Sequence, residues 1–178
     1  MSFNTIELCS KALSRIGANG IVSFDEGTAE AEVAGSIYQI VKQKLLASYP
    51  WGFATETAAL ARIAGEEAFA LPGDFLRAVG VLPRREYRIQ GRRLYSDAEK
   101  VELTYIRDAA EEEFPAQFTA ALVSTLAAEF ALALLDDTAR HNLLARAAAA
   151  ELKEAKLADS QQASPKRIRS FPLIDSRK

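Results

Sequence analysis

Apolar residues in the first third of the chain recur every three or four positions, which is the period of an amphipathic helix. The first series is Ile6, Cys9, Leu13 and Ile16, and the second is Ala34, Ile37, Val41 and Leu45, widened by Ile40 and Leu46. These series predict helices over about residues 4–16 and 28–48. Asn4 and Glu7 have the spacing of a capping box, and Thr28 can cap the second helix.

The second predicted helix ends in an aromatic corner, in which residues 45–55 read LLASYPWGFAT. Pro50 prevents the helix from continuing, because proline has no amide hydrogen and clashes with the preceding turn. Tyr49, Trp51 and Phe53 surround this proline. The rings can fold back over the helix and plug the core, or they can contact another subunit. The pattern favours the core plug and leaves the subunit contact open.

The middle third, about residues 56–106, changes to short apolar runs separated by glycine, proline and charged residues. The expected runs are 57–63, 75–82, 87–89, 94–95 and 101–106. In the last run apolar and polar residues alternate, which is typical of a strand with one buried face. Gln90 and Gly91 lie between two runs and predict a hairpin turn. We therefore expect a small antiparallel β element.

Helical patterning returns after three acidic residues and Pro115, which together are a helix start signal. The pattern predicts helices over about residues 115–135 and 138–158, separated by Asp136 and Asp137. The first of these helices is apolar over most of its circumference. Such a helix is either buried centrally or packed against a second protein. The predicted fold class is mostly α with a small inserted β element, in one domain over residues 1–159.

A tail over residues 160–178 follows the last predicted helix, and its composition indicates no intrinsic fold. Its sequence is polar, then basic, then briefly apolar: SQQASPKRIRSFPLIDSRK. Nineteen extended residues at ~3.3 Å each reach about 60 Å, well beyond a domain of this size. The tail is either free or folds on assembly with neighbouring molecules, and we favour assembly.

Composition and charge narrow the class of protein further. Hydrophobic residues make up 49% of the 178 residues and charged residues 26%, which is ordinary for a globular protein. A net charge of −2 argues against a protein whose main task is to coat nucleic acid. We read no secretory signal and no membrane span, and a single cysteine, Cys9, provides no internal disulfide.

The sequence offers little for catalysis, and it predicts no enzyme, no cofactor and no metal site. Cys9 lies on an apolar helical face without a cationic neighbour, so we interpret it as a core residue. His141 is the only histidine and has no partner at metal-ligand spacing. The paired acids lie at helix starts, where capping explains them.

An arginine-rich hairpin is the remaining charged feature of the folded region. It contains Arg84, Arg85, Arg88, Arg92 and Arg93. Charged residues on a sheet edge prevent pairing between edges, which is the simpler interpretation. The alternative is contact with phosphate or an acidic surface, because arginine binds such groups with two parallel hydrogen bonds.

The order of several segments resembles a known family. The segments are RIGANG, then I-x-S-F-D-E-G-T-A-E-A, KLLASYPWGFAT, LPGDFLRAVGV and FPAQFTAALVSTLAAEFA. This order is similar to the head-to-tail adaptors of tailed bacteriophages, the group that includes tail tubular protein A. The likeness covers roughly residues 4–155, and its most specific part is PWGFAT together with LPGDFLR.

The resemblance implies a structural virion protein in the neck of the particle, assembled in the host cytoplasm. Such adaptors form rings, commonly of twelve subunits, between the portal protein and the tail or nozzle. Genome DNA passes through the lumen without sequence-specific binding, and no membrane is involved. We expect the portal interface in the tail, at Lys166, Arg167, Ile168, Arg169, Phe171, Pro172, Leu173 and Ile174. The alternative is a small DNA-binding or regulatory module that uses the arginine hairpin and the basic tail.

Overall fold

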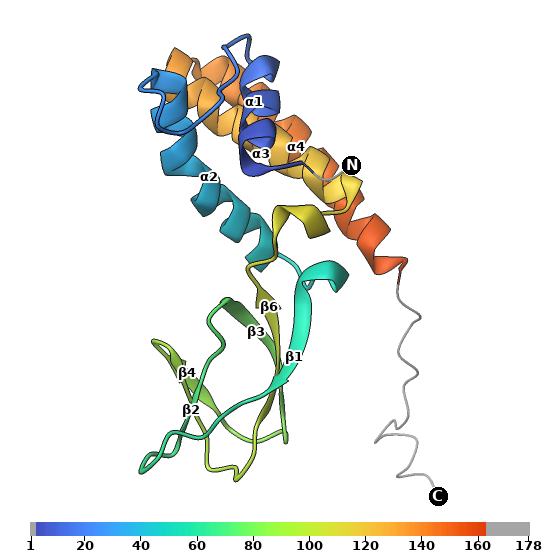
Figure 1. Cartoon of the computed structure of the whole chain (residues 1–178). Coiled ribbons are helices and arrows are strands. Elements are labelled where there is room, and N and C mark those ends of the chain that lie inside the picture. The colour runs from blue at the N-terminus through green and yellow to red at the C-terminus, as the bar shows by residue number, and fades with distance from the viewer. Residues whose placement is uncertain (1–2, 163–178) are drawn as a thin grey trace, which may run out of the picture.

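The computed structural model describes residues 3–162, and within this range helices gather at one end of the molecule and strands at the other (Figure 1). The helices are α1 (Thr5–Arg15), α2 (Ala29–Ala47), α3 (Ala116–Leu135) and α4 (Thr138–Ser160). The strands β1 to β6 all lie between α2 and α3 in the sequence. The predicted class, mostly α with a small inserted β element, is confirmed.

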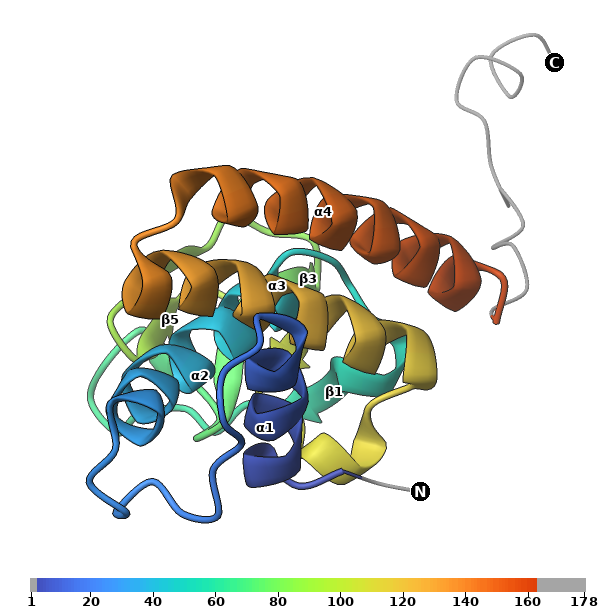
Figure 2. The same ribbon diagram turned by 90° about the horizontal axis from the view of Figure 1, so that it is seen from above.

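Helix α3 is the centre of the helical end. Helix α4 packs along one side of it, while α1 and α2 pack on the other (Figure 2). Ten residues of α3 are buried, among them Phe118, Leu122 and Phe130. The broad apolar surface of this helix is therefore explained by packing on two sides. By length and composition α3 is also the one helix within residues 3–162 that could cross a bilayer, a test that core helices of folded domains pass as well.

The predicted helix caps are confirmed in detail. The Asn4 side chain accepts a hydrogen bond from the Glu7 amide at 2.8 Å, and the Asn4 amide donates to the Glu7 carboxylate at 2.9 Å. Thr28 Oγ1 accepts from the Ala31 amide at 3.2 Å. Between α3 and α4, Asp136 adopts a left-handed conformation and the Asp137 side chain caps α4.

The strands form two antiparallel sheets of three strands each. In one, β6 (Glu102–Arg107) lies between β1 (Thr55–Ala59) and β3 (Phe75–Leu82). In the other, β5 (Arg93–Tyr95) lies between β2 (Ala68–Ala70) and β4 (Arg88–Gln90). The sheets enclose a hydrophobic cluster of their own, separate from the helical core.

Two expectations about the strands need correction. The predicted run 57–63 is too long, because β1 ends at Ala59 and Arg62 makes only an isolated bridge to Phe69. Strand β2 was not predicted, since it has only three residues and two of them are alanines, which are depleted in strands. Pairing with β5, more than twenty residues later, provides its hydrogen bonds.

The hairpin prediction at Gln90 and Gly91 is confirmed, with Gly91 at a φ of +57° between β4 and β5.

Two helix boundaries differ slightly from the expected ones. Pro115 is the N-cap of α3, one position before the first helical residue, and a short 3₁₀ turn, η2 (Glu111–Glu113), precedes it. Helix α4 extends to Ser160, so the first tail residue expected from the sequence belongs to the helix. One residue in the expected apolar stripe of α2, Ile40, is 67% exposed.

Candidate interaction surfaces

The aromatic corner after α2 is a core plug. Trp51 is 1% exposed, and its indole N–H donates to the Leu45 carbonyl oxygen at 3.0 Å. Its ring meets Tyr49 and Phe118 edge to face, with both pairs of ring centroids 5.0 Å apart. Phe53 continues the cluster, packing on Trp51 and Phe118. Pro50 itself is exposed. The prediction of a plug is confirmed for Trp51, and a subunit contact through the corner stays a prediction.

The two most specific segments of the resemblance both lie where the helices meet the sheet. PWGFAT leads from α2 through the short 3₁₀ helix η1 (Gly52–Ala54) into β1. LPGDFLR leads into β3, where Leu76 packs on the helical core and Asp74 accepts a hydrogen bond from the Tyr105 hydroxyl at 3.2 Å. Both segments therefore fix the sheet to the helices, which is a structural task.

A buried ion network at the same joint escaped the sequence analysis. Lys42, on the buried face of α2, is 6% exposed. Its ammonium lies 3.1 Å from Asp108 Oδ1 and 3.2 Å from Glu111 Oε1. Asp108 Oδ1 accepts no well-aligned hydrogen bond from a described residue, so the nearby ammonium charge is its compensation. Lysines are rarely buried without such partners.

Further hydrogen bonds complete the network. Glu111 accepts from the Tyr38 hydroxyl at 2.9 Å and from the Thr5 hydroxyl at 3.3 Å. The side-chain amides of Gln39 and Gln43 donate to the other oxygen of Asp108 at 2.7 and 2.9 Å. The network thus joins α1, α2 and the connection from β6 to α3. No sequence signal marked it, because its members are more than sixty residues apart.

The ionisation of these groups follows from their contacts. Burial opposes the charge of Glu111, but hydrogen bonds from a backbone amide and from Tyr38, together with the charge of Lys42, outweigh it and lower its pKa. Burial and the charge of Glu111 raise the pKa of Tyr38, so its hydroxyl stays protonated and donates. Both shifts favour the ionised carboxylate of Glu111 and the neutral hydroxyl of Tyr38, the forms that this hydrogen bond requires.

Most of the hairpin arginines are engaged by their own sheet. Arg85 pairs with Asp97 at 3.0 Å, and Arg93 pairs with Glu66 at 2.6 Å. Arg92 donates to the Pro72 carbonyl, and the Arg88 guanidinium lies 5.4 Å from the centre of the Tyr95 ring. Arg84 is exposed. These contacts support the solvated-edge interpretation, while the phosphate contact stays a hypothesis. The expected portal residues, 166–174, lie outside the described residues.

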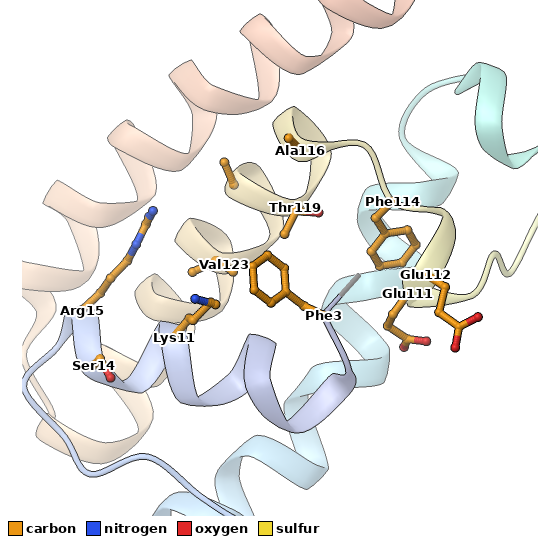
Figure 3. Close-up of a pocket in the computed structure, with 11 residues that line it drawn as sticks. Phe3, Lys11, Ser14, Arg15, Glu111, Glu112, Phe114, Ala116, Thr119 and Val123 are labelled. Carbon is orange, nitrogen blue, oxygen red and sulfur yellow. The ribbon is translucent and has the colours of Figure 1, made fainter. Parts of the chain in front are cut away.

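A groove between α1 and α3 has a volume of about 870 Å³. Phe3, Phe114 and Val123 contribute apolar walls, with Ala116 on the α3 side (Figure 3). Ala120 of α3 also lines the groove. Lys11 and Arg15 line one end, and Glu111 and Glu112 the other (Figure 3). The volume falls within the range of ligand sites, about 300–1,000 Å³. No sequence pattern predicts this groove, because it is formed by two distant segments, residues 3–15 and 111–123.

Uncovered apolar side chains lie on both flanks of the helical end. On α4, Leu143 is 70% exposed and Leu157 60%. On α2, across α3 from α4, Ile40 is exposed to a similar degree. Only two residues of α4, Ala148 and Ala155, are fully buried. The outer helix therefore keeps most of its surface available.

The reactive side chains considered for catalysis have structural contacts. Cys9 is fully buried, and burial raises the pKa of its thiol to about 12. His141 Nδ1 lies 2.9 Å from the Ala128 carbonyl oxygen, which ties α4 to α3. Within residues 3–162, no group of three or more His, Cys, Asp and Glu side chains could hold a metal ion.

A scan against protein-family models finds no match to this chain, and a search of curated proteins finds no significant match either. A functional proposal must therefore rest on the residues and on the geometry described above.

Proposed function

We propose that this chain is a head-to-tail adaptor of a tailed bacteriophage, a structural protein without enzymatic activity. Identical subunits form a ring that joins the portal to the tail or nozzle, and DNA passes through its lumen. The motif order in the sequence, above all PWGFAT followed by LPGDFLR, motivates the choice of this class.

The observation that carries the proposal is the presence of uncovered apolar residues on two opposite flanks. Helix α4, which carries the exposed Leu143 and Leu157, lies across α3 from helix α2, which carries the exposed Ile40 (Figure 2). A ring built head to tail needs two different surfaces on each subunit, one for each neighbour. Large exposed aliphatic residues favour contacts between proteins, because covering them removes apolar surface from water. The flanks of this fold thus offer the two surfaces that a ring requires.

The experiment is native mass spectrometry of the full chain, alone and mixed with the portal protein encoded in the same genome, followed by electron microscopy of any assembly. We expect closed rings, and loss of the rings in Leu143→Glu. The matched control is Val79→Glu, which places the same charge at an exposed valine of β3 and should leave assembly intact. A wild-type chain that stays monomeric at all concentrations and does not bind the portal protein would contradict the proposal.

The alternative, a DNA-binding module, has less support. Four of the five hairpin arginines already contact groups of their own sheet. A DNA-binding surface should show affinity for duplex DNA that falls steeply with salt. Fluorescence anisotropy with a labelled duplex at several salt concentrations measures this directly. Salt-dependent binding that is lost in a combined Arg84→Ala and Arg88→Ala variant would favour the alternative.

A further inference from the structure

The groove between α1 and α3 has an ordered charge pattern. Its acidic end, with Glu112, lies near the start of α3 (Figure 3). At its basic end, Arg15 contacts Ser124 on α3 and pairs with Glu151 on α4 at 3.7 Å. From the acidic end onward, the lining is therefore acidic, then apolar, then basic at Lys11 and Arg15.

The acidic end of the groove is close to Gln162, the last described residue. Gln162 lines a small pocket together with Pro115 and Gln117. Ala116, between those two residues, lines the groove. Helices α3 and α4 run antiparallel, so the start of α3 and the end of α4 lie at the same end of the molecule (Figure 2). Reaching the groove requires crossing about one helix diameter, ~10 Å.

The sequence after Gln162 carries the complementary pattern in the matching order. Basic residues come first, at Lys166, Arg167 and Arg169, followed by the apolar run 171–174 and then Asp175; Arg177 and Lys178 come after the segment that matches the groove. Phe171 comes nine positions after Gln162, an extended reach of ~30 Å. The groove follows α3 from Ala116 to about Val123, ~10 Å at the rise of an α-helix, and four extended residues span ~13 Å. The extended run 171–174 is therefore about as long as the part of the groove that follows α3.

We infer that residues 166–175 of the same chain occupy this groove in the free protein. The basic segment meets the acidic end at Glu112, the run Phe171–Ile174 covers the apolar walls, and Asp175 approaches Lys11 and Arg15. Exposed ion pairs contribute little affinity, so here they set the direction of the segment, and apolar burial holds it. The inference does not depend on the proposed function. The tail residues expected at the portal would be held in the groove until a partner takes them.

Disulfide trapping in the full chain tests the inference. Thr119→Cys places a thiol in the groove, and Ser170→Cys places one beside the apolar run while leaving that run intact. The native Cys9 is fully buried and does not interfere. The matched control combines Ser170→Cys with Val22→Cys, at an 86% exposed position in the loop between α1 and α2.

We expect the groove pair to oxidise about tenfold faster than the control pair, because a docked segment has a high effective concentration at the groove. The product should be a cross-linked monomer. Adding Ala120→Glu, which puts a charge on the groove wall, should reduce the rate to that of the control, whereas Ala147→Glu on the exposed side of α4 should not. Equal rates for both pairs would overturn the inference. A cross-linked dimer would also overturn it, since the groove would then hold the tail of a second copy.

Discussion

The indole nitrogen of Trp51 lies 3.0 Å from the carbonyl oxygen of Leu45, six residues earlier in the chain. The last carbonyl groups of a helix have no partners within the helix, and buried ones need them. Ser48 already donates to the same oxygen from its amide and its hydroxyl. Trp51 therefore both closes the end of α2 and fills the joint between helices and sheet.

Replacing this tryptophan tests the two contributions separately. Trp51→Phe removes the hydrogen bond and part of the ring, and we expect the free energy of unfolding to fall by about 1–3 kcal/mol. Trp51→Ala should cost about 3–5 kcal/mol, because it leaves a cavity beside Phe118. Urea denaturation followed by circular dichroism measures both. Tyr87→Ala, at an exposed aromatic residue of the sheet end, is the control and should change stability by less than about 0.5 kcal/mol.

Lys42→Met should destabilise the protein by about 3–5 kcal/mol, because it leaves Asp108 and Glu111 without their cation in a buried site. Lys44→Met makes the same chemical change two residues later, at an exposed position, and should be close to neutral. Thermal and urea unfolding of the two variants provide the comparison. Similar stability in both variants would show that the network does not hold the joint.

Acid should weaken the network around Glu111, because protonation removes the negative charge that Lys42 and Tyr38 contact. The folded pKa of Glu111 lies below its ordinary value of 4.5, so between these two values the unfolded chain binds more protons than the folded one. Its contribution is present above about pH 4.5 and is lost as pH falls through the folded pKa. We expect Glu111→Gln to be less stable than wild type at pH 7, with a shallower loss of stability between pH 5 and 3. Glu112→Gln is the exposed neighbouring control. A slope unchanged by Glu111→Gln would contradict this prediction.

The hairpin between β4 and β5 depends on one glycine. Gly91 has a φ of +57°, a left-handed conformation that costs other residues about 1–2 kcal/mol. A side-chain carbon at Gly91 or at Gly73 would meet no atom within 4 Å, but only Gly91 has a positive φ. Gly91→Ala should therefore lower stability by about 1 kcal/mol, whereas Gly73→Ala should be neutral. Equal effects in chemical denaturation would show that the turn conformation is not the cause.

Deleting residues 163–178 should separate folding from assembly. The hydrophobic clusters of the described chain are made by residues before position 163, so the shortened protein should still unfold cooperatively. We expect ring formation or portal binding, measured by native mass spectrometry, to be lost. Stopping after Gln162 keeps α4 and its C-cap complete. Wild-type assembly by the shortened chain would contradict a role of the tail in binding partners.

Local rules made most of the helices and caps predictable. Asn4, Thr28 and Asp137 cap their helices by accepting hydrogen bonds from backbone amides three residues later. Gly91 forms the hairpin turn because the turn requires a positive φ, which glycine adopts readily. Strand β2 could not be predicted in this way. Its stability comes from pairing with residues far along the chain, which no short window of sequence contains.

The sequence by itself determined the order of the four helices around an inserted β region, the end of α2 at Pro50 and the apolar character of α3. Each of these depends on contacts or conformations within a few residues. Only the tertiary structure decided that Trp51 is buried, that Ile40 is exposed, and that Lys42 is clamped by Asp108 and Glu111. The groove between α1 and α3 is likewise a feature that only the tertiary structure decided. Burial, ion pairing and the shape of a surface depend on which distant segments pack together. Hydrophobic periodicity shows which face of a helix is apolar, but it does not show which segment packs against that face.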